Sequence, residues 1–134
     1  MRAAILTTLL VVGCGGGASD LASAEMALTT SGLLPSDVGA VELLVFDGAS
    51  GGCARVLTGA SPLDDSGLVL LAHALFVIDG TPKHLAIPAG KSLDFYAEAY
   101  RTAAPGRTPI GRGCVTQTLA AGSPMPVSIS ITAE

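Results

Sequence analysis

The residues with the most distinctive chemistry in this 134-residue chain are its three cysteines, Cys14, Cys53 and Cys114. A cysteine thiol can be acylated, oxidised to a disulfide or bound to a metal ion. Cys14 follows directly on an apolar segment near the start, whereas Cys53 and Cys114 lie far apart in the body of the chain. Cys14 therefore needs a different explanation from the other two.

The first fourteen residues have the layout of a secretory leader. One positive charge, on Arg2, precedes an apolar run from Ala3 to Val12, and small residues then lead into Cys14. The run is shorter than the roughly 17–25 residues that a membrane-spanning helix needs. The segment from Val11 to Cys14 resembles the lipobox of bacterial lipoproteins, which implies acyl chains such as palmitate on Cys14 and cleavage before it. The alternative is an ordinary signal peptide, or a short membrane anchor, with an incidental cysteine.

This interpretation divides the chain into three parts. Residues 1–13 are the signal peptide, residues 14–25 are the lipidated cysteine and a flexible linker that begins with three glycines, and residues 26–134 are the folded domain. The roughly 120 residues that follow cleavage are enough for one domain with a single core.

Cys53 and Cys114 form an even pair in a chain that the leader exports. Exported proteins meet oxidants, so the pair favours one disulfide. The alternatives are two free buried thiols or part of a metal site. A metal is disfavoured because no second group of ligands has zinc-like spacing, and we expect no metal and no cofactor.

Charge and composition argue against several classes of function. The net charge is −4, and the seven lysines and arginines are scattered along the chain, so a nucleic-acid partner is not expected. Aromatic residues make up 4% of the chain and tryptophan is absent, which leaves little material for stacking on bases or sugars.

Residues 48–52 match the pattern G-x-S-x-G of a serine nucleophile, with Ser50 at its centre. His73 and His84 follow later in the order that an α/β-hydrolase uses. Such a site needs a helix after the serine and a large parallel sheet, whereas residues 53–57 are strand-like and the chain is short. We therefore expect a flexible hairpin loop and no enzyme, with a small secreted hydrolase using Ser50 as an alternative.

Short apolar or alternating segments separated by glycine and proline turns predict an all-β domain of about seven strands, arranged as a single antiparallel sandwich. Residues 68–78 fit either a strand or a helix, and their flanking turns favour a strand. In residues 93–100 an apolar face alternates with a polar one, which predicts a half-buried strand. The expected strands are residues 26–30, 41–47, 53–57, 68–78, 85–87, 93–100, 110–119 and 127–132.

The second half of the chain resembles the transthyretin-like or carboxypeptidase-regulatory-like sandwich, an Ig-like architecture. The similarity lies in the turn Ile87–Gly90, the strand Leu93–Tyr100, the segment Ile110–Cys114 and the closing strand Val127–Ile131. The same residues are similar to the small cysteine-paired lipoproteins of myxobacteria-type genomes. The resemblance implies the fold and an accessory or adhesive role, and it supplies no catalytic residue.

Tyr96, Tyr100, Arg101 and Arg112 form the most chemically varied group on the expected polar face. We interpret them as a surface for an envelope protein or a glycan, because tyrosine and arginine are enriched in interface hot spots. Ordinary solvated residues on a sheet are the alternative.

Together these features predict a non-catalytic structural or binding module on the bacterial cell envelope, attached to the membrane through Cys14. Gly15 and Gly16 follow Cys14, and the absence of aspartate there resembles lipoproteins delivered to the outer membrane. A carrier of an apolar ligand is a further alternative. It needs a cavity, whereas the medium-sized alternating residues predict a filled core.

Overall fold

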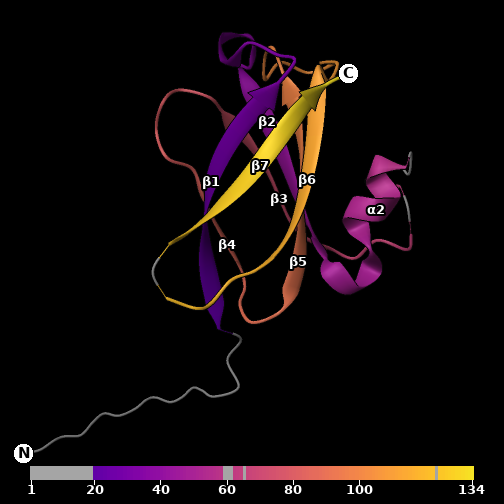
Figure 1. Ribbon diagram of the computed structural model, residues 1–134, viewed down its shortest axis with the longest axis vertical. Helices are drawn as coiled ribbons and strands as arrows, with labels where there is room; N and C mark the ends of the chain where they lie inside the picture. The colour runs from indigo at the N-terminus through magenta and orange to yellow at the C-terminus, as the bar shows by residue number, and fades with distance from the viewer. Residues whose placement is uncertain (1–19, 59–61, 65, 123) are drawn as a thin grey trace, which may run out of the picture.

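The computed structural model describes residues 20–134 except residues 59–61, 65 and 123. The leader, Cys14 and residues 15–19 of the expected linker lie outside the described residues. The described part contains seven strands, one short α-helix and two 3-10 helices (Figure 1). Their bounds are β1 (Leu21–Ser31), η2 (Pro35–Asp37), β2 (Ala40–Asp47), η3 (Gly48–Ser50), α2 (Gly52–Leu57), β3 (Leu70–Val77), β4 (His84–Pro88), β5 (Ser92–Tyr100), β6 (Gly111–Thr118) and β7 (Met125–Ala133).

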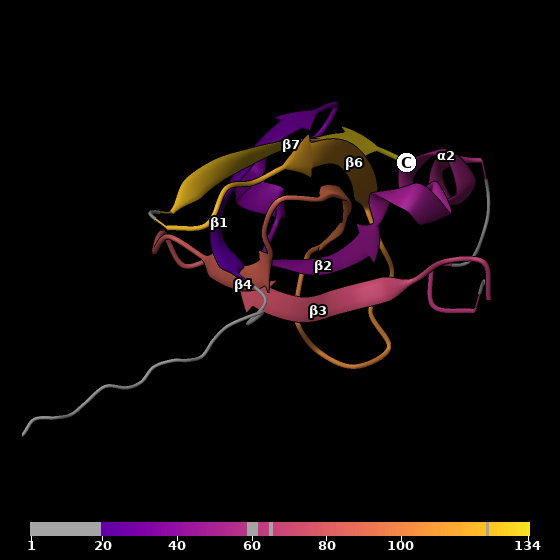
Figure 2. The same ribbon diagram turned by 90° about the horizontal axis from the view of Figure 1, so that it is seen from below.

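All seven strands belong to one sheet in the order β3-β2-β5-β6-β7-β1-β4. Neighbouring strands are antiparallel except β1 and β7, the first and the last, which run parallel. The sheet curls until it is nearly barrel-shaped (Figure 2). The expected all-β class is confirmed and seven of the eight expected segments are strands, but the antiparallel sandwich is wrong. Alternation along a strand shows which face is apolar. It does not show whether that face packs against a second sheet or against other strands of the same curled sheet.

The main core fills the inside of this curled sheet. Alternate residues of each strand point inward, as the two-residue period of a strand requires. These side chains come from five strands and are almost completely buried: Ala22, Ala24, Val41, Leu43, Val45, Ile87, Phe95, Ala97, Ala99, Val127, Ile129 and Ile131.

Glycine lets β6 approach β7 closely. A Cβ atom added to Gly113 would lie 2.1 Å from the carbonyl oxygen of Ser130, and one added to Gly111 would lie 2.7 Å from that of Thr132. No side chain fits at such distances, so these two positions allow the sheet to bend sharply between β6 and β7.

A second, smaller core lies on the outer face of the sheet. Leu44 and Phe46 of β2, Tyr96 of β5 and Val56 of α2 are buried together there. The helix α2 lies against this face beside β5 and β6 (Figure 1). The strand expected for residues 53–57 is therefore wrong, because this segment folds as a helix that packs on the sheet.

Three other boundaries differ from or refine the expectations. β1 begins at Leu21, so residues 21–25 belong to the folded sheet and not to the linker. On one side residues 24–31 of β1 pair with β7, whereas on the other side β4 pairs only with residues 21–25. Residues 70–77 form the strand β3, which resolves the ambiguity over residues 68–78 in favour of a strand.

Candidate functional site

The expected disulfide is present: Cys53 at the start of α2 is bonded to Cys114 in β6. Asp94 of β5 supports the same junction, because its carboxylate accepts hydrogen bonds from the Cys53 backbone N–H at 3.0 Å and from the Thr116 hydroxyl. Asp94 is only 3% exposed. Burying a carboxylate costs free energy unless it is hydrogen-bonded. The hydrogen bonds from these two donors offset that cost. The helix is thus fixed to the sheet by a covalent bond and a buried acid.

Of the four residues interpreted as an interaction surface, the two tyrosines are buried and the two arginines reach solvent. Tyr96 is fully buried and Tyr100 is 4% exposed, so neither ring can contact a partner. Arg101 is exposed and lies 3.3 Å from Asp37, and Arg112 pairs with Glu134 at 2.8 Å. The expected exposure of the tyrosines is wrong because Val56 of α2 packs against Tyr96 and Arg107, from the loop of residues 101–110, lies over Tyr100.

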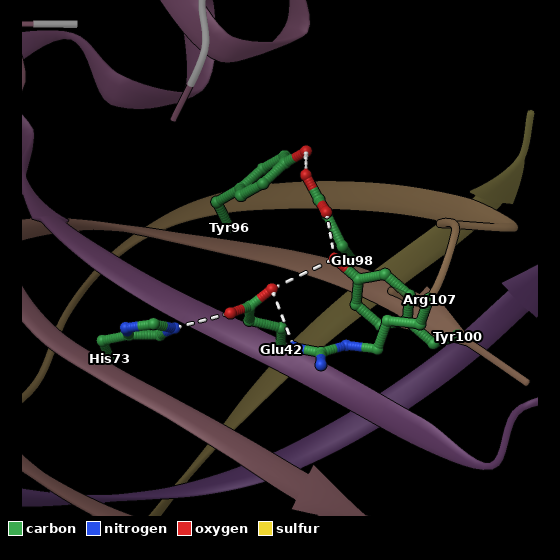
Figure 3. A network of polar contacts seen from close by, with 6 residues as sticks. All are labelled: Glu42, His73, Tyr96, Glu98, Tyr100 and Arg107. Carbon is green, nitrogen blue, oxygen red and sulfur yellow. Dashed lines mark hydrogen bonds and ion pairs between the residues drawn. The ribbon is translucent and has the colours of Figure 1, made fainter. Parts of the chain in front are cut away.

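The tyrosines belong to a network of polar side chains on β2 and β5 (Figure 3). The Tyr96 hydroxyl donates to one carboxylate oxygen of Glu98 at 2.6 Å, and the Tyr100 hydroxyl contacts the other. Tyr100 also lies 3.0 Å from Glu42, which is the cross-strand neighbour of Glu98. A phenol has one hydrogen, so the Tyr100 hydroxyl can donate to only one of the two glutamates at a time.

Two further groups bind Glu42. The His73 imidazole Nε2 lies 2.7 Å from one carboxylate oxygen, and the Arg107 guanidinium lies 3.4 Å from the other. Burial alone would raise the pKa of Glu42, but the hydrogen bonds from His73 and Tyr100 and the charge of Arg107 outweigh it and lower the pKa. Glu42 is therefore held as a carboxylate.

Arg107 connects this network to the loop that covers it. Its guanidinium lies over the Tyr100 ring, 4.6 Å from the ring centroid, which is a cation–π contact. Burial, reinforced by the neighbouring glutamates, raises the pKa of both Tyr96 and Tyr100. The phenols thus act as neutral donors, and the network fastens the loop to the sheet. The phenol hydroxyls and the carboxylate oxygens are engaged with one another, which suits a structural role, whereas the Arg107 Nε is buried without a hydrogen-bond partner among the described residues.

The residues of the alternative hydrolase site each contact other groups. The Ser50 hydroxyl donates to the carbonyl of Asp47 at 2.6 Å. Both histidines contact glutamates elsewhere, His73 on Glu42 and His84 at 3.7 Å from Glu25. A helix does follow Ser50, contrary to expectation, but Ser50 lacks the strained backbone of a nucleophile elbow, because no non-glycine residue of the described chain has a positive φ.

An apolar cavity of about 380 Å³ opens between β1, β2 and β3 and beneath the loop of residues 78–83. Its walls include Met26, Leu28, Val41, Leu43 and Phe76. A smaller pocket of about 110 Å³ adjoins it and shares Leu28 and Ile78. The filled core expected from the alternating residues is therefore incomplete at this place.

Two features are absent from the described residues. None of their helices has the length and apolar character that crossing a membrane requires. No group of three or more histidine, cysteine or acidic side chains within residues 20–134, leaving aside the five undescribed positions, could hold a metal ion.

Sequence reasoning missed Glu42, Asp94 and Arg107 as structural residues. One signal was available for Glu42, the one polar residue inside the otherwise apolar run from Val41 to Phe46. A lone acid in such a run needs partners if both faces of the strand are covered. Nothing local marked Arg107, because its role depends on a loop folding back over β5.

Comparison with known proteins gives one likeness in fold. No family model and no curated protein matches the chain. The structure of an alternative pilotin from the type II secretion system of Vibrio cholerae superposes with a TM-score of 0.51 and 11% sequence identity. The match covers 85% of this chain and 97% of the pilotin chain. At this identity the comparison concerns the fold, which the two proteins share across nearly their whole domains.

Proposed function

We propose that this chain is a lipid-anchored, non-catalytic accessory protein of the bacterial envelope, which assists a larger assembly such as a secretion system. The observation that carries the proposal is the leader that ends in Cys14, only seven residues before the first strand begins at Leu21. Acylation of Cys14 would hold the folded domain close to the membrane surface, because two or more acyl chains give lasting attachment.

Two further observations support this proposal. The fold is like that of a pilotin from a type II secretion system. The polar side chains that sequence offered for catalysis are engaged in structural contacts, Ser50 with Asp47 and His73 with Glu42. A binding or assembly role uses the shape of such a domain and needs no reactive group.

Metabolic labelling with a palmitate analogue in a Gram-negative host tests the anchor. We expect label on the wild-type chain, recovery in outer-membrane fractions, and no label on the Cys14→Ser variant. The Cys53→Ser variant is the matched control and keeps the label. Label on the Cys14→Ser variant, or an unlabelled wild type, would contradict the proposal.

A serine-reactive fluorophosphonate probe tests the non-catalytic part. We expect equal background labelling of the wild type and of the Ser50→Ala variant. Labelling that disappears with Ser50→Ala would establish the hydrolase instead.

A further inference from the structure

The wall of the curled sheet is incomplete beside β1. Strand β4 pairs with β1 only from Leu21 to Glu25, whereas β1 continues to Ser31. On that side the described strands offer no partner for the second half of β1, and β3 forms the other end of the sheet. The β3–β4 loop crosses this gap, where the Lys83 carbonyl accepts a hydrogen bond from the Met26 N–H at 2.9 Å.

The apolar cavity of about 380 Å³ lies behind this gap. Its volume is within the range of ligand pockets, about 300–1,000 Å³. The adjoining pocket of about 110 Å³ continues the apolar space past Leu28 and Ile78 towards Pro35, Val38 and Ile131. An apolar cavity of about 150 Å³ accommodates benzene, so the larger cavity alone has room for an aliphatic chain of roughly 12–15 carbons.

The polar groups of this space are gathered at one end. Glu25, Asp79, Thr81 and Lys83 line the larger cavity near the loop. At the other end the walls are apolar except for Thr30, whose hydroxyl donates to the Leu33 carbonyl at 3.0 Å. A space that is polar at one end and apolar along its length matches an amphiphile with a single chain.

The charges at the polar end restrict the head group. The Lys83 ammonium lies 2.8 Å from the Asp79 carboxylate and 2.9 Å from the Thr81 hydroxyl, so its charge is already balanced. Glu25 adds a second carboxylate to the same lining. An anionic head group would therefore face two carboxylates with one lysine that is already paired, whereas an uncharged or zwitterionic head group avoids this repulsion.

We propose that this cavity binds the acyl chain of a single-chain amphiphile whose head group is uncharged or zwitterionic, such as a monoacylglycerol or a lysophosphatidylcholine. The chain lies along β1 between Met26 and Ile78, and the head group lies at the loop of residues 79–83. The site does not use Cys14, so this inference stands or falls separately from the lipid anchor.

Photo-crosslinking on the full chain in phosphatidylcholine vesicles tests the site. The probe is monomyristoylglycerol with a diazirine near the end of its chain, and peptide mass spectrometry locates the label. We expect label within residues 25–43 and 76–78, lost on addition of unlabelled monomyristoylglycerol or myristoyl lysophosphatidylcholine. Myristic acid should compete about tenfold less well, which corresponds to about 1.4 kcal/mol. Label that excess competitor does not reduce, or stronger competition by myristic acid, would overturn the proposal.

A pair of variants separates the cavity from the exposed apolar surface. Met26→Phe with Leu28→Phe fills the cavity from β1 and should reduce labelling about tenfold. Leu75→Phe adds similar bulk to an exposed side chain of β3 and should leave labelling unchanged. Full labelling of the double variant, or label concentrated at Leu75 and Val77, would show adsorption to the surface. Thermal unfolding verifies that both variants fold, and if the double variant does not fold, the competition in the wild type decides.

Discussion

Cys53 and Cys114 join the helix α2 to the outer surface of β6 across 61 residues of sequence. The bond lies beside the buried Asp94 carboxylate, which accepts from the Cys53 N–H. Helix, disulfide and acid together convert one face of β5 from a solvated surface into a second core. The stability of that outer core should therefore depend on the disulfide more than the stability of the interior does.

Replacing both cysteines by serine tests whether the disulfide stabilises the fold. In the chain-entropy model a closed loop of this length stabilises the folded state by about 4 kcal/mol. We expect Cys53→Ser with Cys114→Ser to lower the free energy of unfolding by about that amount in urea titrations. Reductant should destabilise the wild type similarly and have no effect on the double variant. Equal unfolding midpoints for all samples would contradict a stabilising bond.

The two tyrosines of the chain provide a spectroscopic test of the polar network, because both belong to it. Burial and the neighbouring Glu98 raise the pKa of Tyr96 and Tyr100 above the ordinary value of 10.0. The folded protein should thus show no tyrosinate absorbance at a pH about one unit above that value, whereas the urea-unfolded chain ionises there.

The sign of the pH effect follows from linkage. A raised pKa in the folded state stabilises the fold below pH 10, and that stability is lost as the pH rises further. Tyrosinate absorbance and loss of structure should therefore appear together on the alkaline side. Ionisation of either phenol near pH 10 with the fold intact would contradict the network.

Glu42 gives the corresponding test in acid. The hydrogen bonds and charge around it lower its pKa below 4.5 in the folded state, despite its burial. Its contribution to stability is present above the pKa of the unfolded chain and is lost as the pH falls through the folded value. The difference in free energy of unfolding between the wild type and Glu42→Gln should be largest near neutral pH and shrink below about pH 4.5. A difference that is constant with pH would show that Glu42 contributes only by its shape.

Gly113 tests the close approach of β6 to β7. A Cβ atom there would lie 2.1 Å from the Ser130 carbonyl oxygen, so Gly113→Ala must displace one of the two strands. We expect a loss of about 3 kcal/mol in the free energy of unfolding. Thr118→Ala, at an exposed position of the same strand, should change it by less than about 0.5 kcal/mol. Similar unfolding curves for the two variants would mean that the strands are not held this closely.

The sequence was informative where a pattern is local. Alternation along residues 93–100 predicted an apolar inner face, and Phe95 and Ala97 are indeed fully buried. Flanking turns identified residues 68–78 as a strand, and the export leader led to the disulfide between Cys53 and Cys114. Each of these expectations depends on a few neighbouring residues, or on the oxidising surroundings that exported proteins meet.

The features that were mistaken depend on contacts distant in sequence. The six residues of α2 are too few for their apolar period to separate helix from strand, and the helix forms where Val56 can pack on Phe46 and Tyr96. Alternation predicts a solvated polar face on β5, but Arg107, seven residues after Tyr100, covers the Tyr100 ring. The parallel pairing of β1 with β7 joins the two ends of the domain, and no local pattern indicates it.

The intact mass of the protein purified from membranes of a Gram-negative host, before and after reduction, tests the central claim most directly. The account predicts a chain that begins at Cys14 and carries the added mass of its acyl chains. Reduction should add the mass of two hydrogens for the bond between Cys53 and Cys114. A full-length chain that still begins with Met1 and carries no acyl group would contradict it.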